Sequence, residues 1–104
     1  MNESFEHNVI QLLAAVPPGK VTTYGDLAKA AGFKTYSRQV ARVLKQLPRD
    51  SKLPWFRVIN SQGKISLPAG SDAFYLQKKH LMDEGVTVIG DKISLKTFRY
   101  DFGL

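Results

Sequence analysis

The spacing of apolar residues predicts a helix at the start of the chain. In the first 16 residues, apolar side chains recur at steps of three and four positions, which places them on one face of an α-helix. We therefore predict a helix over residues 2–16. The turn Pro17-Pro18-Gly19 ends it, because proline cannot continue the helical hydrogen bonds. The recurring residues are Phe5, Val9, Leu12, Leu13 and Val16.

Two shorter helices are predicted next. Thr23 can cap the first of them, with Asp26 three positions later as the partner of a weak capping box, and this helix stops at Gly32. The second covers about residues 35–47, where a proline ends it. Two short helices joined by a glycine-containing turn predict a helix-turn-helix over about residues 23–47.

The middle of the chain is predicted to contain a loop and two short strands. Residues 48–54 are polar and bounded by prolines, which is typical of a loop. The apolar runs 58–59 and 65–67 flank the turn Ser61-Gln62-Gly63, and we predict that they pair with each other.

The last third of the chain is predicted to be a helix followed by a hairpin. Ser71 caps a helix that reaches Gly85, and residues 86–89 and 92–95 flank a Gly-Asp pair. No internal repeat or long linker divides the chain. We therefore predict one small α+β domain, mostly helical, over residues 1–104.

The composition excludes several classes of protein. With 43% apolar and 23% charged residues, the chain matches globular proteins rather than disordered ones. No apolar run approaches the roughly 20 residues of a membrane span, and no signal-peptide pattern opens the sequence. The absence of cysteine excludes disulfides, thiolate metal sites and thiol nucleophiles. The two histidines, His7 and His80, lie too far apart in sequence to suggest a metal site. We expect a cytoplasmic monomer without metal, cofactor or membrane partner.

Positive charge is concentrated in one part of the chain. The net charge is +6, but residues 20–64 contain ten basic and two acidic residues, or +8, whereas the rest of the chain sums to −2. This asymmetry favours binding to a polyanion, with nucleic acid first and anionic lipid second. A basic face that only keeps the protein in solution is the alternative.

The predicted helix over residues 35–47 places the charge on one face. At about 100° per residue, Arg42 and Lys45 lie within roughly 40° of Arg38. Ala41 borders this cationic face, where its small side chain would allow close approach to a nucleic-acid backbone. The opposite face is predicted to be core and contains Val40, Val43, Leu44 and Leu47.

Aromatic residues are interleaved with this charge. Tyrosine and tryptophan can stack on bases, a contact worth about 1–3 kcal/mol where it forms. We predict that Phe33 and Phe56 are packing residues, whereas Tyr36 suits either role. Trp55 follows a proline in a polar loop, where a core tryptophan is less expected.

The segment Pro54-Trp55-Phe56-Arg57-Val58 resembles a known signature. In the O6-alkylguanine-DNA alkyltransferases this signature is Pro-Cys-His-Arg-Val, and the chain resembles more closely the alkyltransferase-like proteins, in which tryptophan replaces the cysteine. The resemblance covers about residues 5–85. It also rests on residues 16–28, on Ser37-Arg38-Gln39-Val40, on Asn60-Ser61-Gln62-Gly63 and on Asp83-Glu84-Gly85.

The resemblance implies the fold of the alkyltransferase C-terminal DNA-binding domain and a way of binding DNA. It implies a helix-turn-helix that binds the minor groove and turns a damaged guanine out of the duplex into a pocket. Arg38 matches the arginine finger that fills the gap in the duplex, and Tyr24 matches the tyrosine that presses on the phosphate.

The resemblance also implies a set of site residues and partners. The pocket loop covers about residues 53–70, and its rim, residues 66–70, contains neither the tyrosine nor the arginine of some relatives. The implied partners are double-stranded DNA with O6-alkylguanine and the proteins of nucleotide excision repair. The implied lesion pocket consists of Tyr24, Pro54, Trp55, Ser66 and Ala69, and the implied contacts to the DNA backbone are Thr35, Tyr36, Ser37, Arg42 and Lys45.

The catalytic part of the resemblance is missing. The transferases use a thiolate acceptor, activated by histidine and glutamate, but Trp55 stands at the acceptor position and Phe56 at the histidine position. Of the relay only Glu84 is left, and Arg57 is implied to be structural. We therefore predict a lesion sensor and not an enzyme. A helix-turn-helix regulator without lesion specificity, and an enzyme that uses a residue other than cysteine, are the alternatives.

Overall fold

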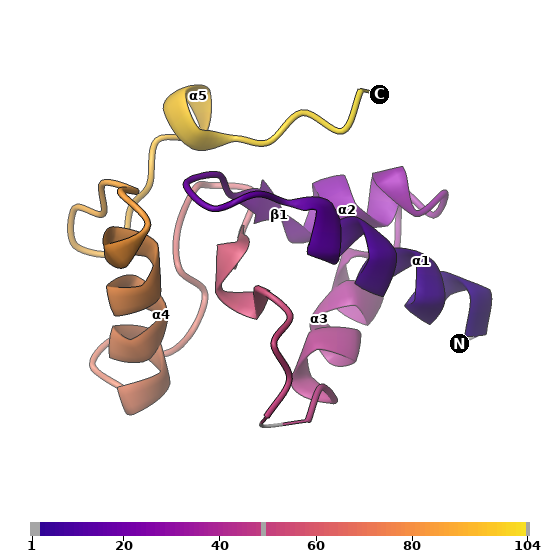
Figure 1. Ribbon diagram of the computed structural model, residues 1–104, viewed down its shortest axis with the longest axis horizontal. Coiled ribbons are helices and arrows are strands. Elements are labelled where there is room, and N and C mark those ends of the chain that lie inside the picture. Colours follow the sequence, from indigo (N-terminus) through magenta and orange to yellow (C-terminus); the bar gives the residue numbers. More distant parts are fainter. Residues whose placement is uncertain (1–2, 49, 104) are drawn as a thin grey trace.

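The helices form two groups with the middle of the chain between them (Figure 1). The computed structural model describes residues 3–48 and 50–103. Helices α1, α2 and α3 lie on one side, helix α4 lies on the other, and the C-terminal segment crosses from one side to the other. The elements are α1 (Glu3–Ala15), β1 (Thr22–Thr23), α2 (Tyr24–Ala30), α3 (Ser37–Lys45), the 3-10 turn η1 (Trp55–Arg57), β2 (Val58–Ile59), α4 (Asp72–Asp83) and α5 (Leu95–Phe98).

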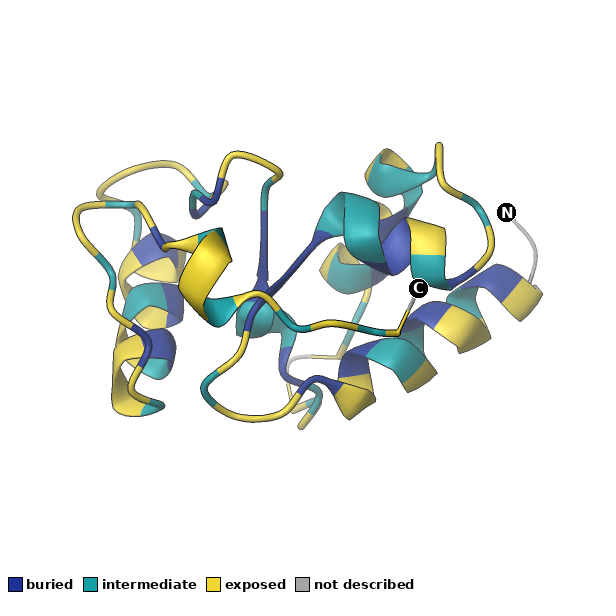
Figure 2. Ribbon diagram, turned by 90° about the horizontal axis from the view of Figure 1, so that it is seen from above, coloured by how far each residue is buried: buried dark blue, intermediate teal, exposed yellow. Residues whose placement is uncertain are grey.

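Two hydrophobic cores meet at the strand pair. Strands β1 and β2 are parallel, with Thr22 opposite Val58 and Thr23 opposite Ile59. Successive side chains of a strand point to opposite faces. Val58 therefore belongs to the core of α1, α2 and α3, and Ile59 to the core beside α4. Figure 2 shows the buried residues on one face of α1 and along the segments between the two groups of helices.

The predicted helices are confirmed. The Thr23 hydroxyl accepts a hydrogen bond from the amide of Asp26 at 3.0 Å, and the Ser71 hydroxyl accepts one from the amide of Phe74 at 3.2 Å. These caps begin α2 and α4, because the first amides of a helix have no partner within it. For the first helix, the predicted start at residue 2 lies outside the described residues.

Of the two predicted strand pairings, the first is wrong and the second is confirmed only at its turn. The turn after β2 exists, since the amide of Gly63 donates to the carbonyl of Asn60 at 3.0 Å, but β2 pairs with β1 instead of with residues 65–67. The terminal hairpin is reduced to a single bridge between Ile89 and Lys92, and the residues from Leu95 form α5.

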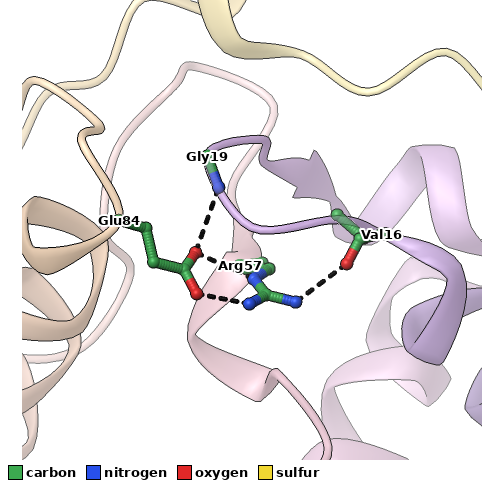
Figure 3. A network of polar contacts seen from close by, with 4 residues as sticks. All are labelled: Val16, Gly19, Arg57 and Glu84. Atoms are coloured by element: carbon green, nitrogen blue, oxygen red, sulfur yellow. Dashed lines mark hydrogen bonds and ion pairs between the residues drawn. The ribbon is translucent and has the colours of Figure 1, made fainter.

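Arg57 joins the two groups of helices (Figure 3). Its guanidinium donates from Nη1 to the carbonyl of Val16 after α1, at 2.8 Å, and from Nε to Glu84 Oε1 after α4, at 2.9 Å. Its Nη2 pairs with Glu84 Oε2, and the amide of Gly19 donates to Glu84 Oε1 at 3.3 Å. The hydrogen bond from Arg57 holds the pKa of Glu84 below its ordinary value of 4.5, although burial acts in the opposite direction.

The C-terminal segment is attached to the first group of helices. The Arg99 guanidinium donates to both carboxylate oxygens of Asp26 at 2.7 Å. The amide of Val21 donates to the carbonyl of Phe98 at 2.9 Å, and the amide of Tyr100 donates to the carbonyl of Val21 at 2.7 Å. The segment thus lies along the residue that precedes β1 and reaches α2.

We predict opposite effects on stability from two neighbouring threonines. Thr22 Oγ1 is buried and has no hydrogen-bond partner among the described residues. Thr22→Val should raise the free energy of unfolding by about 1 kcal/mol, because it removes an unsatisfied buried hydroxyl. Thr23→Val should lower it by about 1 kcal/mol, because the cap of α2 is lost. Urea unfolding measures both values, and a loss of stability in Thr22→Val would contradict the prediction.

We predict that the Arg57–Glu84 pair stabilises the fold. Their side chains are only 12% and 15% exposed, so Glu84→Gln leaves a largely buried guanidinium without its counter-charge and should cost about 2 kcal/mol or more at pH 7. Asp83→Asn is the matched control. It removes the adjacent carboxylate of Asp83, which is 61% exposed and pairs with Lys79, whose side chain is 73% exposed. This substitution should change the free energy of unfolding by about 0.5 kcal/mol or less.

The same pair predicts a pH dependence. Because the pKa of Glu84 is lower in the folded protein than the ordinary 4.5, its stabilising contribution is complete above 4.5 and is lost as the pH falls through the lowered folded pKa. The difference in unfolding free energy between wild type and Glu84→Gln should therefore shrink at acidic pH. A difference that stays constant from pH 7 down to about pH 2 would show that Glu84 does not act through its charge.

Candidate nucleic-acid interface

A cavity of about 650 Å³ lies between α3 and the turn η1, with α4 and the loop before it forming another wall. It collects side chains that are far apart in the sequence. Tyr24 begins α2 on one side, and Trp55 begins η1 on the other. The described lining residues are Tyr24, Ser37, Arg38, Ala41, Leu44, Lys45, Trp55, Val58, Asn60, Ser66, Leu67, Pro68, Ala73 and Gln77.

Helix α3 provides the cationic side of this cavity. Val40 and Val43 are buried against the first core, whereas the three basic side chains of the helix are exposed, as the helical wheel predicts. Arg38 and Lys45 line the cavity, but Arg42 is not among the lining residues. Only some of the exposed cations of α3 therefore reach the cavity.

Trp55 is supported by other aromatic rings. It makes edge contacts with Phe56 and His80, at 5.9 and 6.4 Å between ring centroids, and Phe56 stacks on His80 at 4.5 Å. The indole is half-buried and lines the cavity, while Phe56 does not. The packing role predicted for Phe56 therefore fits its contacts, and the indole packs against two other rings.

Tyr24 and Ser66 approach each other across the cavity. Their hydroxyl oxygens are 3.0 Å apart, although the residues are 42 positions apart in the sequence. The structure thus brings together Tyr24, Trp55 and Ser66 of the expected lesion pocket. It places the other two expected residues outside the lining: Pro54 is buried immediately before η1, and Ala69 is exposed in the loop beyond.

The residues expected to contact the DNA backbone differ in their surroundings. Thr35 is exposed, and Ser37 lies at the start of α3 and lines the cavity. The Tyr36 ring stacks on Phe33 at 5.1 Å and meets Phe5 edge-on at 5.3 Å. The ring of Tyr36 therefore packs against the first core, and Phe33 covers one of its faces.

Gln77 is the main site residue that the sequence analysis missed. It is only 3% exposed, and its Nε2 donates to the backbone carbonyls of Phe56 at 2.9 Å and Val58 at 3.0 Å. A usable signal was present: Phe74, Gln77 and Leu81 form one buried stripe of α4, and glutamine is the polar exception in it. Leu44, Val58, Asn60 and Ala73 were also not expected to line a cavity.

The cavity combines an apolar wall with positive charge. Of its described lining residues, Arg38 and Lys45 are cationic and none is acidic. Glu84, the last residue of the implied relay, is bound by Arg57 and does not line the cavity. Within residues 3–48 and 50–103, no three potential metal ligands gather, and no helix is long and apolar enough to cross a membrane. This site can hold a flat apolar group beside an anion.

Comparison with known proteins matches both the sequence and the structure to one family. Residues 4–86 match the family described as the DNA-binding domain of 6-O-methylguanine DNA methyltransferase. The chain is 48% identical over 101 residues to the DNA base-flipping protein of Escherichia coli, covering 96% of this chain and 77% of that protein. It is 40% identical over 86 residues to alkyltransferase-like protein 1 of Schizosaccharomyces pombe, covering 83% of this chain and 80% of that protein.

A solved structure supports the same assignment. The crystal structure of the S. pombe protein in complex with damaged DNA containing O6-carboxymethylguanine superposes with a TM-score of 0.89 at 35% identity, covering 97% of this chain and 98% of that one. This agreement confirms the small, mostly helical domain expected from the sequence. The chain therefore belongs to the family of the 6-O-methylguanine DNA methyltransferase DNA-binding domain, and within it to the alkyltransferase-like, base-flipping proteins.

Proposed function

We propose that this protein recognises O6-alkylguanine in duplex DNA without repairing it. It binds the minor groove through α2 and α3, turns the alkylated base out of the stack, and holds it in the cavity lined by Trp55. The held lesion then marks the site for nucleotide excision repair. The observation that carries this proposal is the cavity of about 650 Å³ between the cationic helix α3 and Trp55.

The known relatives support a base-flipping role. The E. coli relative is a DNA base-flipping protein, and the S. pombe relative has been crystallised on DNA containing O6-carboxymethylguanine. The similarity to both covers most of each chain. The S. pombe protein, crystallised with such DNA, has the same fold as this chain. Charge is consistent with this function, because the segment from residue 20 to residue 64 carries +8.

Three side chains would share the work of base flipping. Arg38 is exposed at the start of α3 and lines the cavity, so it can enter the duplex where the base has left. Tyr24 at the start of α2 would press on the phosphate beside the lesion. Trp55 would pack against the extruded base or its alkyl group, a contact of about 1–3 kcal/mol.

Alkyl transfer is not part of the proposed function. The chain has no cysteine, and the indole of Trp55 is a poor nucleophile at neutral pH. Glu84 cannot activate an acceptor either, since its carboxylate accepts hydrogen bonds from Arg57 and the amide of Gly19. The DNA should keep its alkyl label in a single-turnover assay, whereas loss of the label would indicate an enzyme that uses another residue.

The lone tryptophan provides a direct test of lesion binding. Trp55 is the single tryptophan of the chain and lies in the cavity. A duplex with one O6-methylguanine should change its fluorescence at a concentration about tenfold lower than the same duplex with guanine, since only the flipped base contacts the indole. Identical titrations for both duplexes would contradict lesion recognition. A dependence on the surrounding sequence alone would favour a helix-turn-helix regulator.

We predict that Arg38 and Arg42 differ in their effect on lesion binding. They are the same residue type one helical turn apart, but only Arg38 lines the cavity. Arg38→Ala should weaken binding of the O6-methylguanine duplex about tenfold or more, equivalent to about 1.4 kcal/mol. Arg42→Ala and Lys45→Ala should weaken it less and reduce the salt dependence, as expected for phosphate contacts. Equal losses in all three variants would make Arg38 an ordinary phosphate contact.

A further inference from the structure

We infer that Gln77 is a positioning residue for lesion recognition: its side-chain amide holds the Trp55 turn at the wall of the cavity. The inference rests on the proposed function, because it concerns how the same cavity distinguishes a lesion from an undamaged base. Gln77 lies in α4, outside the helix-turn-helix, and no part of the family resemblance pointed to it.

The geometry gives Gln77 two bonds to one short segment. Its Nε2 carries two hydrogens, and it donates to the carbonyls of Phe56 and Val58, on either side of Arg57. These carbonyls lie 21 and 19 positions away in the sequence. One rigid amide group therefore binds the backbone at both ends of the dipeptide Arg57-Val58. Trp55 lies immediately before Phe56, the first of the two residues whose carbonyls are bound.

Gln77 and Arg57 hold the turn η1 from different directions. The side chain of Arg57 extends from the turn to Val16 and Glu84, whereas the side chain of Gln77 reaches the backbone of the turn from α4. The turn itself contains little internal support: the amide of Arg57 donates to the carbonyl of Pro54, and the amide of Val58 donates to the carbonyl of Trp55. Without Gln77, the backbone beside Trp55 would lose its only side-chain donors among the described residues.

The burial of Gln77 indicates a requirement for its donors. Its neighbours in the buried stripe of α4 are Phe74 and Leu81, so an apolar residue would satisfy the packing at this position. A buried glutamine is costly unless its amide is hydrogen-bonded. Because Gln77 also lines the cavity, its loss should act on the extruded base rather than on the contacts that α3 makes with the duplex.

The test replaces the amide while keeping the size of the side chain. Gln77→Met removes both donors, and Gln77→Glu replaces them with a carboxylate that faces two carbonyl oxygens. Gln11→Met is the matched control, because Gln11 is exposed on α1 and does not line the cavity. Affinities for an O6-methylguanine duplex and for the undamaged duplex are measured well below the melting temperature of each variant, together with the Trp55 emission of the free protein.

We expect both Gln77 variants to lose about tenfold in affinity for the lesion duplex and to keep their affinity for undamaged DNA. Their free Trp55 emission should shift to longer wavelength, and Gln11→Met should match wild type. A Gln77→Met variant with unchanged preference for the lesion would overturn the inference while the wild-type preference still supported the proposed function. If the wild-type protein binds both duplexes equally, the proposed function fails. In that case the emission of free Trp55 still tests the positioning role, and an unshifted emission in both Gln77 variants would refute it.

A measurement on the wild-type protein covers the case in which the variants do not fold. The side-chain amide protons of Gln77 should exchange slowly with water in NMR spectra, because both are bonded and buried. Adding the lesion duplex should shift these two resonances, and the undamaged duplex should not. Amide signals that exchange rapidly, or that stay in place while Trp55 responds to the lesion, would overturn the inference.

Discussion

The ion pair between Arg57 and Glu84 connects the stability of this fold to the geometry of its cavity. A guanidinium has five N–H groups and cannot lose its charge, so burying it requires partners on several sides. Arg57 finds them at the carbonyl of Val16, after α1, and at Glu84, after α4. The two groups of helices must therefore stand at the separation that one arginine can span. Because Arg57 belongs to the same 3-10 turn as Trp55, that separation also fixes the position of the indole.

The same contact engages Glu84 outside the cavity. The carboxylate of Glu84 is occupied by a cation and an amide, and the hydrogen bond from Arg57 lowers its pKa, which makes it a weaker base. Phe56 stacks on His80, and both rings make edge contacts with Trp55, so the indole belongs to an aromatic cluster. What faces the cavity includes an indole, a phenol, aliphatic and uncharged polar side chains, and two of the three cations of α3. Such a surface offers stacking, exclusion of water and charge complementarity.

Local rules predicted the helices but not the strand partners. Periodicity and capping located α1, α2, α3 and α4 because both act within a few residues, and the cationic face of α3 followed from its helical spacing. A two-residue strand contains no information about its partner, so the nearby run 65–67 was predicted to pair with residues 58–59. In the structure, β2 instead pairs in parallel with β1, which precedes α2 in the chain. The role of Tyr36 was left open between packing and stacking, and Gln77 was not recognised, for a related reason. The contacts of the Tyr36 ring and of the Gln77 amide depend on segments that are distant in the sequence.

The sequence by itself determined helices α1 to α4, the concentration of positive charge, the absence of a thiol nucleophile and, through the motif around Trp55, the family. Each of these properties depends on residue identity and short-range spacing. Only the tertiary structure decided which exposed cations of α3 reach the cavity, that the hydroxyls of Tyr24 and Ser66 meet there, and that Gln77 binds the backbone beside Trp55. The physical reason is that hydrogen bonds and packing act over a few ångströms. Which residues come that close is set by how the two hydrophobic cores join at β1 and β2, and neither core is contained in one stretch of the chain.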